Sequence, residues 1–237
     1  MALPTLESPI YELTVPSLKK KIKYRPFTVK EEKVLLMALE SEDNTQIVDA
    51  IKGIIDACVF KTGGKKPFKI EELATFDIEY IFLNIRARSV GEIIELILTC
   101  PDDMETDIKV SINIEDIQVH FEDDHEDTIQ LTDDLWIQMG YPGIDSFTAN
   151  DESIDDTFAL IGKSIKKIYN EEDVWDRSTA KEDEFVTFVE TMNSKQFAKV
   201  QKFFDTLPTL RHTIKAKNPK TQHEFEYTVE GLSNFFA

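Results

Sequence analysis

Lys61–Pro67 is the segment whose residue types come closest to a nucleotide-binding loop. Its sequence, KTGGKKP, contains the glycines and lysines of a phosphate loop but not the spacing G-x-x-x-x-G-K-[ST]. The residues before it have helical periodicity, whereas a phosphate-binding loop follows a strand. The pattern favours a flexible basic turn, and a nucleotide site is the alternative.

The acidic run Glu122–Asp127 is the corresponding candidate for a hard cation. Its sequence, EDDHED, places five carboxylates around His125. It lacks the alternating ligands and the sixth-position glycine of an EF-hand loop, so a solvated acidic turn is favoured. The alternative function is therefore a metal- or nucleotide-dependent enzyme that uses this cluster or the Lys61–Pro67 loop.

The two cysteines and four histidines lack the spacing of a zinc or catalytic site. No C-x-x-C, H-E-x-x-H or G-x-S-x-G sequence occurs. Cys100 precedes Pro101 as in half of a zinc knuckle, but aspartates stand where a second thiolate would be needed. Cys58 lies in an apolar run typical of a free, buried thiol. The sequence predicts no catalytic residue, no cofactor site and no metal site.

Three pairs of residues are candidates for partner binding: Arg86 and Arg88, Phe235 and Phe236, and Asp123 and Asp124. The arginines close an apolar helix, where they either complement its dipole or reach a carboxylate or a partner backbone. The phenylalanines end the chain in GLSNFF, and they either dock in the protein's own core or enter a partner groove. The aspartates belong to the acidic run and would attract a basic partner.

Composition excludes several classes of protein. The chain has 237 residues and a net charge of −18, and nucleic-acid binding depends on lysine and arginine displacing counterions. The apolar runs are shorter than the roughly 18 residues that a membrane span needs, and the N-terminus lacks the pattern of a signal peptide. We expect no nucleic-acid partner, no membrane partner and a cytosolic location.

Hydrophobic periodicity divides the chain into helical and extended segments. The first helix opens with a capping box of Thr28 and Glu31. Val34, Leu35, Leu36 and Leu39 are expected to form its apolar face. Further helices are predicted from about Thr45, from near Ile70 to Ser89, over 154–168, over 181–192 and after a cap at Ser194. Extended segments are predicted at YELTV, KKKIKYRPF, EIIELILTC, METDIKVSI, IEDIQVHF, TIQLTDDLWIQM, LRHTIKAK and HEFEYTV.

The expected fold class is α+β, with helical bundles segregated from antiparallel hairpins. The turn-rich segment YPGIDSFTANDES separates residues 1–140, with the N-terminal helices and strands, from residues 141–237, with the C-terminal helices and a terminal hairpin. The two halves are loosely similar, since each runs from helices to a hairpin with an X-Pro turn. They form either two domains or one.

Three segments resemble the T4-type bacteriophage base-plate protein family: DIEYIFLNIRARSVGEIIEL, FAKVQKFFDTLPTLRHTI and EGLSNFF. The family includes baseplate hub and hub-assembly proteins. The resemblance implies a non-catalytic hub component or assembly chaperone whose partners are other hub and tail proteins, basic ones among them. It implies a location in the host cytoplasm during assembly, or in the virion tail baseplate. Members carry a cysteine-bearing knuckle in the hairpin, where this chain has Cys100 alone.

Overall fold

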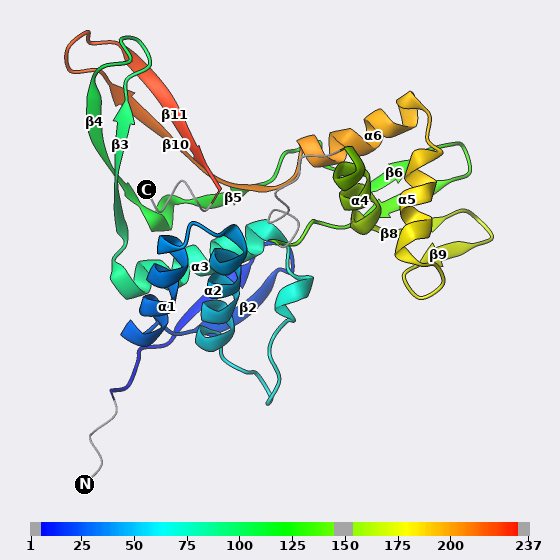
Figure 1. Cartoon of the computed structure of the whole chain (residues 1–237), viewed down its shortest axis with the longest axis horizontal. Coiled ribbons are helices and arrows are strands. Elements are labelled where there is room, and N and C mark those ends of the chain that lie inside the picture. The colour runs from blue at the N-terminus through cyan, green and yellow to red at the C-terminus, as the bar shows by residue number, and fades with distance from the viewer. Residues whose placement is uncertain (1–5, 145–153, 232–237) are drawn as a thin grey trace. The chain divides into compact units, whose positions relative to one another are not determined.

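The computed structural model describes residues 6–144 and 154–231. These residues form two compact units. Figure 1 shows the chain coloured by residue number from the N-terminus to the C-terminus. Of the described residues, those before residue 121 and after residue 208 form unit 1, and those from 121 to 208 form unit 2. Unit 1 is therefore discontinuous in sequence, and the boundary expected between residues 140 and 141 lies inside unit 2.

Unit 1 is built from helices and antiparallel hairpins. Its elements are β1 (Tyr11–Val15), β2 (Lys20–Tyr24), α1 (Val29–Glu40), α2 (Asn44–Cys58), the short 3₁₀ helix η1 (Ile70–Glu72), α3 (Thr75–Val90), β3 (Ile93–Thr99), β4 (Asp107–Asn113), the 3₁₀ helix η2 (Ile114–Asp116), β5 (Gln118–His120), β10 (Thr209–Lys217) and β11 (Glu224–Glu230). The strands pair as β1–β2, as β3–β4, and as a sheet of order β11-β10-β5.

Helix α3 is the centre of unit 1, because it packs against α2, β1, β5 and β10. It is apolar around most of its circumference, and Ile81, Phe82, Leu83 and Ile85 are completely buried. A helix that is hydrophobic all round belongs in a core. Each such side chain contributes about 1.5–3 kcal/mol through burial, so this helix organises the hairpins around it.

Unit 2 packs helices against a four-stranded antiparallel sheet. Its elements are β6 (Thr128–Gln130), β7 (Trp136–Met139), α4 (Ile154–Ser164), β8 (Ile165–Tyr169), β9 (Val174–Asp176), α5 (Glu182–Glu190) and α6 (Ser194–Asp205), and the strand order is β6-β7-β8-β9. Ile137 and Ile168 are directly opposite one another in the sheet. They pack with Phe185, Val200 and Phe203 in a separate core.

The structure confirms the α+β class and corrects several local predictions. The helix predicted over 154–168 ends at Ser164 and continues as β8. The helix predicted from Ile70 is a 3₁₀ turn followed by α3, which begins at Thr75. Asn193 rather than Ser194 caps α6, since its Oδ1 accepts hydrogen bonds from Lys195 N and Gln196 N. Strand β9 has no counterpart among the predicted segments.

The apolar face of α1 also differs from its prediction. Leu35 is buried and Leu39 is half-buried, but Val34 and Leu36 are 52% and 53% exposed. Because helical positions repeat every 3.6 residues, one helix side can cover the core while apolar residues on another stay in solvent. Half of the predicted face of α1 thus lies on the surface.

Candidate functional site

Arg88 stabilises the junction between α3 and the first hairpin. Its guanidinium pairs with Glu92 and lies 2.5 Å from Glu115 Oε1. The same group lies 4.9 Å from the centroid of the Tyr11 ring, within the range of a cation–π contact. Two carboxylates and an aromatic ring of unit 1 therefore surround Arg88.

Arg86 lies two residues earlier on the same helix and is half-buried. Burial lowers the pKa of its guanidinium below the usual value for arginine. Residues two apart point to different sides of a helix, so the two arginines do not form one surface. Phe235 and Phe236 lie outside the described residues.

The acidic run is held to the body of unit 2 by His125. The ring of His125 stacks on Tyr141, with centroids 5.6 Å apart, and contacts Phe203 at 5.1 Å. Its Nδ1 lies 2.9 Å from Thr206 Oγ1. Because that hydroxyl donates to Lys202 O at 2.8 Å, its oxygen accepts the Nδ1–H, which selects this tautomer. Burial lowers the pKa of His125, and the neutral ring serves as an anchor.

Asp124 is neutralised by a lysine of α6. Its Oδ2 lies 2.9 Å from Lys202 Nζ, and this hydrogen bond lowers the pKa of Asp124 below its usual range. Asp123, beside it, is exposed. Both aspartates are therefore exposed, and they differ in that Asp124 pairs with a lysine of α6.

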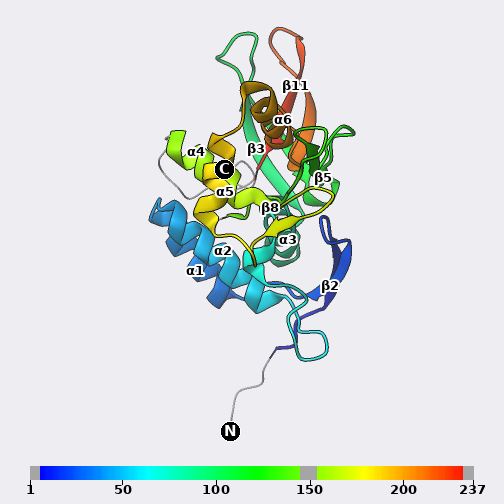
Figure 2. The same cartoon turned by 90° about the vertical axis from the view of Figure 1, so that its right-hand side faces the viewer.

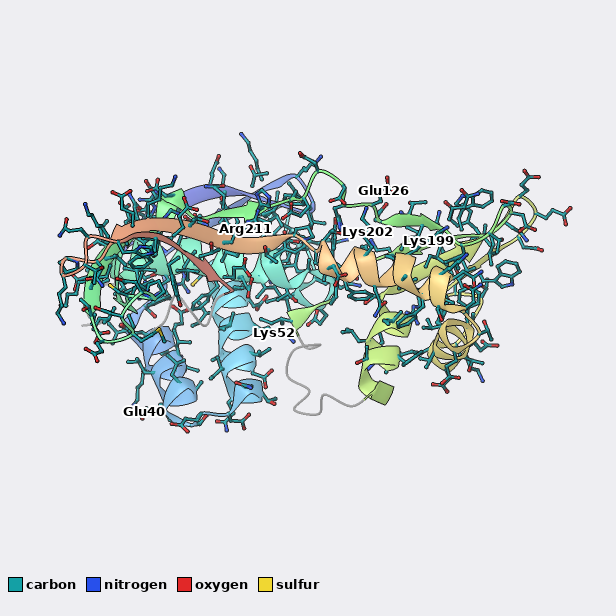
Figure 3. All side chains as sticks on the ribbon, turned by 90° about the horizontal axis from the view of Figure 1, so that it is seen from above. Glu40, Lys52, Glu126, Lys199, Lys202 and Arg211 are labelled. Carbon is teal, nitrogen blue, oxygen red and sulfur yellow. The ribbon has the colours of Figure 1, made fainter. Side chains whose placement is uncertain are left out.

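A groove of about 240 Å³ lies between the acidic turn and α6. Its lining includes two acidic residues, Asp124 and Glu126, two lysines, Lys199 and Lys202, and the apolar Ile129 and Phe203. Figure 3 shows Lys199 and Lys202 on α6, with Glu126 on the neighbouring loop. Lys199 Nζ donates to Gln130 O at 2.6 Å. With charges of both signs, the groove suits polar protein groups better than a polyanion.

The Lys61–Pro67 loop is a tight turn in the structure. Thr62 N and Lys65 O are 2.8 Å apart, and Gly63 and Gly64 both have positive φ, 60° and 81°. Two successive positive φ values define the type I′ turn that glycine favours. Lys66 Nζ donates to Val59 O at 2.9 Å and also pairs with Asp56, so this lysine is engaged in structural contacts.

The chemistry-bearing residues that the sequence singled out do not converge in one place. Among residues 6–144 and 154–231, no group of three or more His, Cys, Asp or Glu side chains is arranged to hold a metal ion. Cys58 and Cys100 are free and buried, as predicted for Cys58, and burial raises the pKa of the Cys58 thiol to about 11. Within the same ranges no helix is long and apolar enough to cross a membrane.

A surface that the sequence did not reveal lies on the outer side of α1. Val29, Leu36 and Met37 are 80%, 53% and 60% exposed. Their spacing of seven and eight residues puts them on one helical face. The sequence of α1 contains more apolar residues than one buried helix face needs. Periodicity alone did not show which of these residues are left exposed because no other element packs on them.

Comparison with known proteins gives one family match. The sequence model described as "T4 bacteriophage base plate protein" matches residues 8–237, which is nearly the entire chain. No curated protein matches significantly, and no solved structure does so.

Proposed function

Because the chain belongs to the T4 bacteriophage base plate protein family, we propose that it acts in the baseplate hub, as a hub component or a hub-assembly chaperone. Its work is protein–protein contact without catalysis, and its partners are other hub and tail proteins. It is present in the host cytoplasm during assembly, and in the virion tail if it stays with the hub.

The exposed face of α1 is the observation that carries this proposal. Val29, Leu36 and Met37 form a row of apolar side chains on one helix, flanked by the exposed Val34. Grouped apolar side chains on a surface mark sites of protein association. A helix with such a face fits an apolar groove or a second helix, which is the kind of contact that an assembly protein makes.

The charge of the molecule supports the same proposal. The excess of 45 acidic over 27 basic residues favours encounter with a basic partner. Asp123, exposed in the acidic turn, is available for such an encounter, while Asp124 pairs with Lys202. Phe235 and Phe236 remain part of the proposed contact surface.

Mass spectrometry of purified particles, beside a pull-down from infected cells, separates the two hub roles. A chaperone is recovered with hub proteins from cells and is missing from particles. A structural component is recovered from both. Recovery from neither with any tail protein would contradict both roles.

Substitution of the α1 face tests the contact surface directly. In the double variant Leu36→Ser, Met37→Ser we expect recovery of hub proteins to fall about tenfold, since burial of such side chains contributes about 1–2 kcal/mol at an interface. A separate experiment, deletion of residues 234–237, tests the tail. For the α1 face, the matched control is Val174→Ser, which removes a 54% exposed apolar side chain from unit 2. Undiminished recovery with the double variant would exclude α1 as the contact.

A further inference from the structure

The tips of two hairpins in unit 1 have similar backbone hydrogen bonds, although the second tip is one residue shorter. In the β3–β4 tip, Cys100 donates its N–H to Thr106 O at 2.8 Å and accepts from Met104 N at 2.9 Å. In the β10–β11 tip, Asn218 donates its N–H to His223 O at 2.8 Å, five residues on rather than six, and accepts from Gln222 N at 2.9 Å. In both tips the first residue precedes a proline, so Cys100 and Asn218 occupy equivalent positions.

The similarity extends to backbone conformation. Met104 and Gln222, each four residues after its equivalent partner, have φ of 54° and 65°. Side chains other than glycine seldom adopt such values, so their recurrence at the same place in both tips defines one turn type. Figures 1 and 2 show the two hairpins in the same part of unit 1.

Two turns with ligands at their first and fourth residues form the usual frame of a four-cysteine zinc site. Those positions are held here by Cys100, Asp103, Asn218 and Thr221. Family resemblance implies a cysteine-bearing knuckle in this hairpin, but these side chains do not fit a zinc ion. Only one of them is a thiol, and burial together with nearby carboxylates raises the pKa of that thiol.

The contacts made by Asn218 also exclude a metal ligand at this position. Its Nδ2 donates to Asp102 Oδ1 at 2.9 Å and to Asp103 Oδ2 at 3.1 Å. An amide N–H₂ group is a donor and has no lone pair for a metal ion. Its Oδ1 accepts from Lys220 N at 2.8 Å. Both ends of this completely buried side chain are therefore committed to the protein.

Further hydrogen bonds complete the contact between the tips. Thr221 Oγ1 donates to Asp102, so two residues of the second tip bind the same carboxylate. Asp103 also accepts from Thr106 N at 3.0 Å and Thr106 Oγ1 at 2.6 Å. Hydrogen bonds to the charged form of a carboxylate stabilise it, and the pKa values of Asp102 and Asp103 are both held below the usual range.

We infer that the two tips are a matched pair of knuckles, joined by a hydrogen-bonded clasp of Asn218 and Thr221 with Asp102 and Asp103 in the place where a metal ion would join four cysteines. The clasp holds the β3–β4 and β10–β11 hairpins together without a metal. It also covers Cys100, whose side chain has no exposed surface.

The first test opens the clasp. Asn218→Ala leaves two carboxylates without their shared donor, and we expect the melting temperature to fall by about 3–8 °C. Alkylation of Cys100, followed by peptide mass spectrometry, should accelerate about tenfold. Thr213→Ala is the matched control, because it removes an exposed hydrogen bond to Thr228 from the same hairpin. If Asn218→Ala does not fold, Thr221→Val opens one contact only. Unchanged melting and alkylation in both variants would overturn the clasp.

The second test restores the metal. The triple variant Asp103→Cys, Asn218→Cys, Thr221→Cys, with native Cys100, should bind one Co²⁺ with the visible absorption of a tetrahedral thiolate site, and Zn²⁺ should displace it. The wild-type protein, purified with zinc present, should contain none by elemental analysis. Stoichiometric zinc in the wild type, or no tetrahedral spectrum in the triple variant, would show that the tips are not knuckles of this kind.

Discussion

Glu31 links three segments of unit 1 through a single carboxylate. It accepts the N–H of Thr28 at 2.6 Å, which completes the capping box of α1, and the guanidinium of Arg25 at 2.6 and 3.0 Å. Arg25 in turn donates to Ala57 O at 3.2 Å, at the end of α2. Both side chains of the pair are about four-fifths buried, so the end of β2 and the two helices share one charged contact.

Removal of this charge should give a stability loss that depends on pH. The hydrogen bond from Arg25 lowers the pKa of Glu31 to about 2, below its value of about 4.3 in an unfolded chain. A lowered folded-state pKa stabilises the fold above pH 4.3, and this contribution is lost as the pH falls toward 2. We expect Glu31→Gln to cost about 2 kcal/mol at pH 7.

Urea unfolding of wild type and Glu31→Gln at pH 7, 4 and 2.5 measures the effect. The difference between the two proteins should narrow steadily as the pH falls. The exposed pair Lys69–Glu72, with side chains 76% and 64% exposed, provides the control Glu72→Gln, for which little change is expected at any pH. A difference independent of pH would show that Glu31 acts through its shape alone.

At the scale of elements, β8 shows how a strand can imitate a helix. Ile161, Ile165 and Ile168 are spaced as on a helical face, and all three are buried. In the strand, Ile165 and Ile168 are both buried because of a β-bulge. The pairing with β7 shifts register between Gln138 and Met139, and Lys166 is left unpaired. An extra residue reverses the side-chain alternation, so two isoleucines three residues apart both face the core.

Most elements were predictable because their signals are local. The capping box of Thr28 and Glu31 and the two long hairpins follow from nearby residues, and the structure confirms them. The bulge at Lys166 depends on the opposite strand. The clasp at Asn218 joins residues more than a hundred positions apart, and the exposure of Leu36 depends on which neighbours are missing. Local periodicity contains none of this information.

The identity of the α6 cap gives a prediction at this scale. Asn193 Oδ1 accepts from Lys195 N at 3.0 Å and Gln196 N at 3.1 Å, whereas Ser194 is the first residue of the helix. Asn193→Ala should therefore cost about 1 kcal/mol. Ser194→Ala, its neighbour, should cost almost nothing. Chemical denaturation followed by the fluorescence of Trp136 and Trp175 reports on unit 2. Equal losses in the two variants would argue that neither residue is the cap.

At the scale of the whole molecule, unit 2 is an insertion within a single β-ladder of unit 1. His120 at the end of β5 lies directly opposite Thr209 at the start of β10. Antiparallel partners have Cα atoms about 4.5–5.5 Å apart, a gap that a short hairpin loop can close. Each unit also has its own buried core, as independently folding parts do.

Replacement of residues 121–208 by a short Gly-Asn linker should therefore leave unit 1 folded. Residues 121–208 expressed alone should fold as well. Circular dichroism and amide-proton NMR spectra of the two fragments should add up to the spectrum of the intact chain, apart from resonances near the cuts. A disordered spectrum from either fragment would show that the units depend on one another for folding.

The ladder between β5 and β10 also sets an order of events on the ribosome. Unit 2 is a continuous stretch, so its core is complete once residue 208 has emerged. Unit 1 must wait for β10 and β11, which follow unit 2 in the chain, before its three-stranded sheet and its clasp can form. We expect the middle of the chain to finish folding before its beginning does. Until β10 has emerged, the side of α3 that packs against this strand in the finished protein stays exposed.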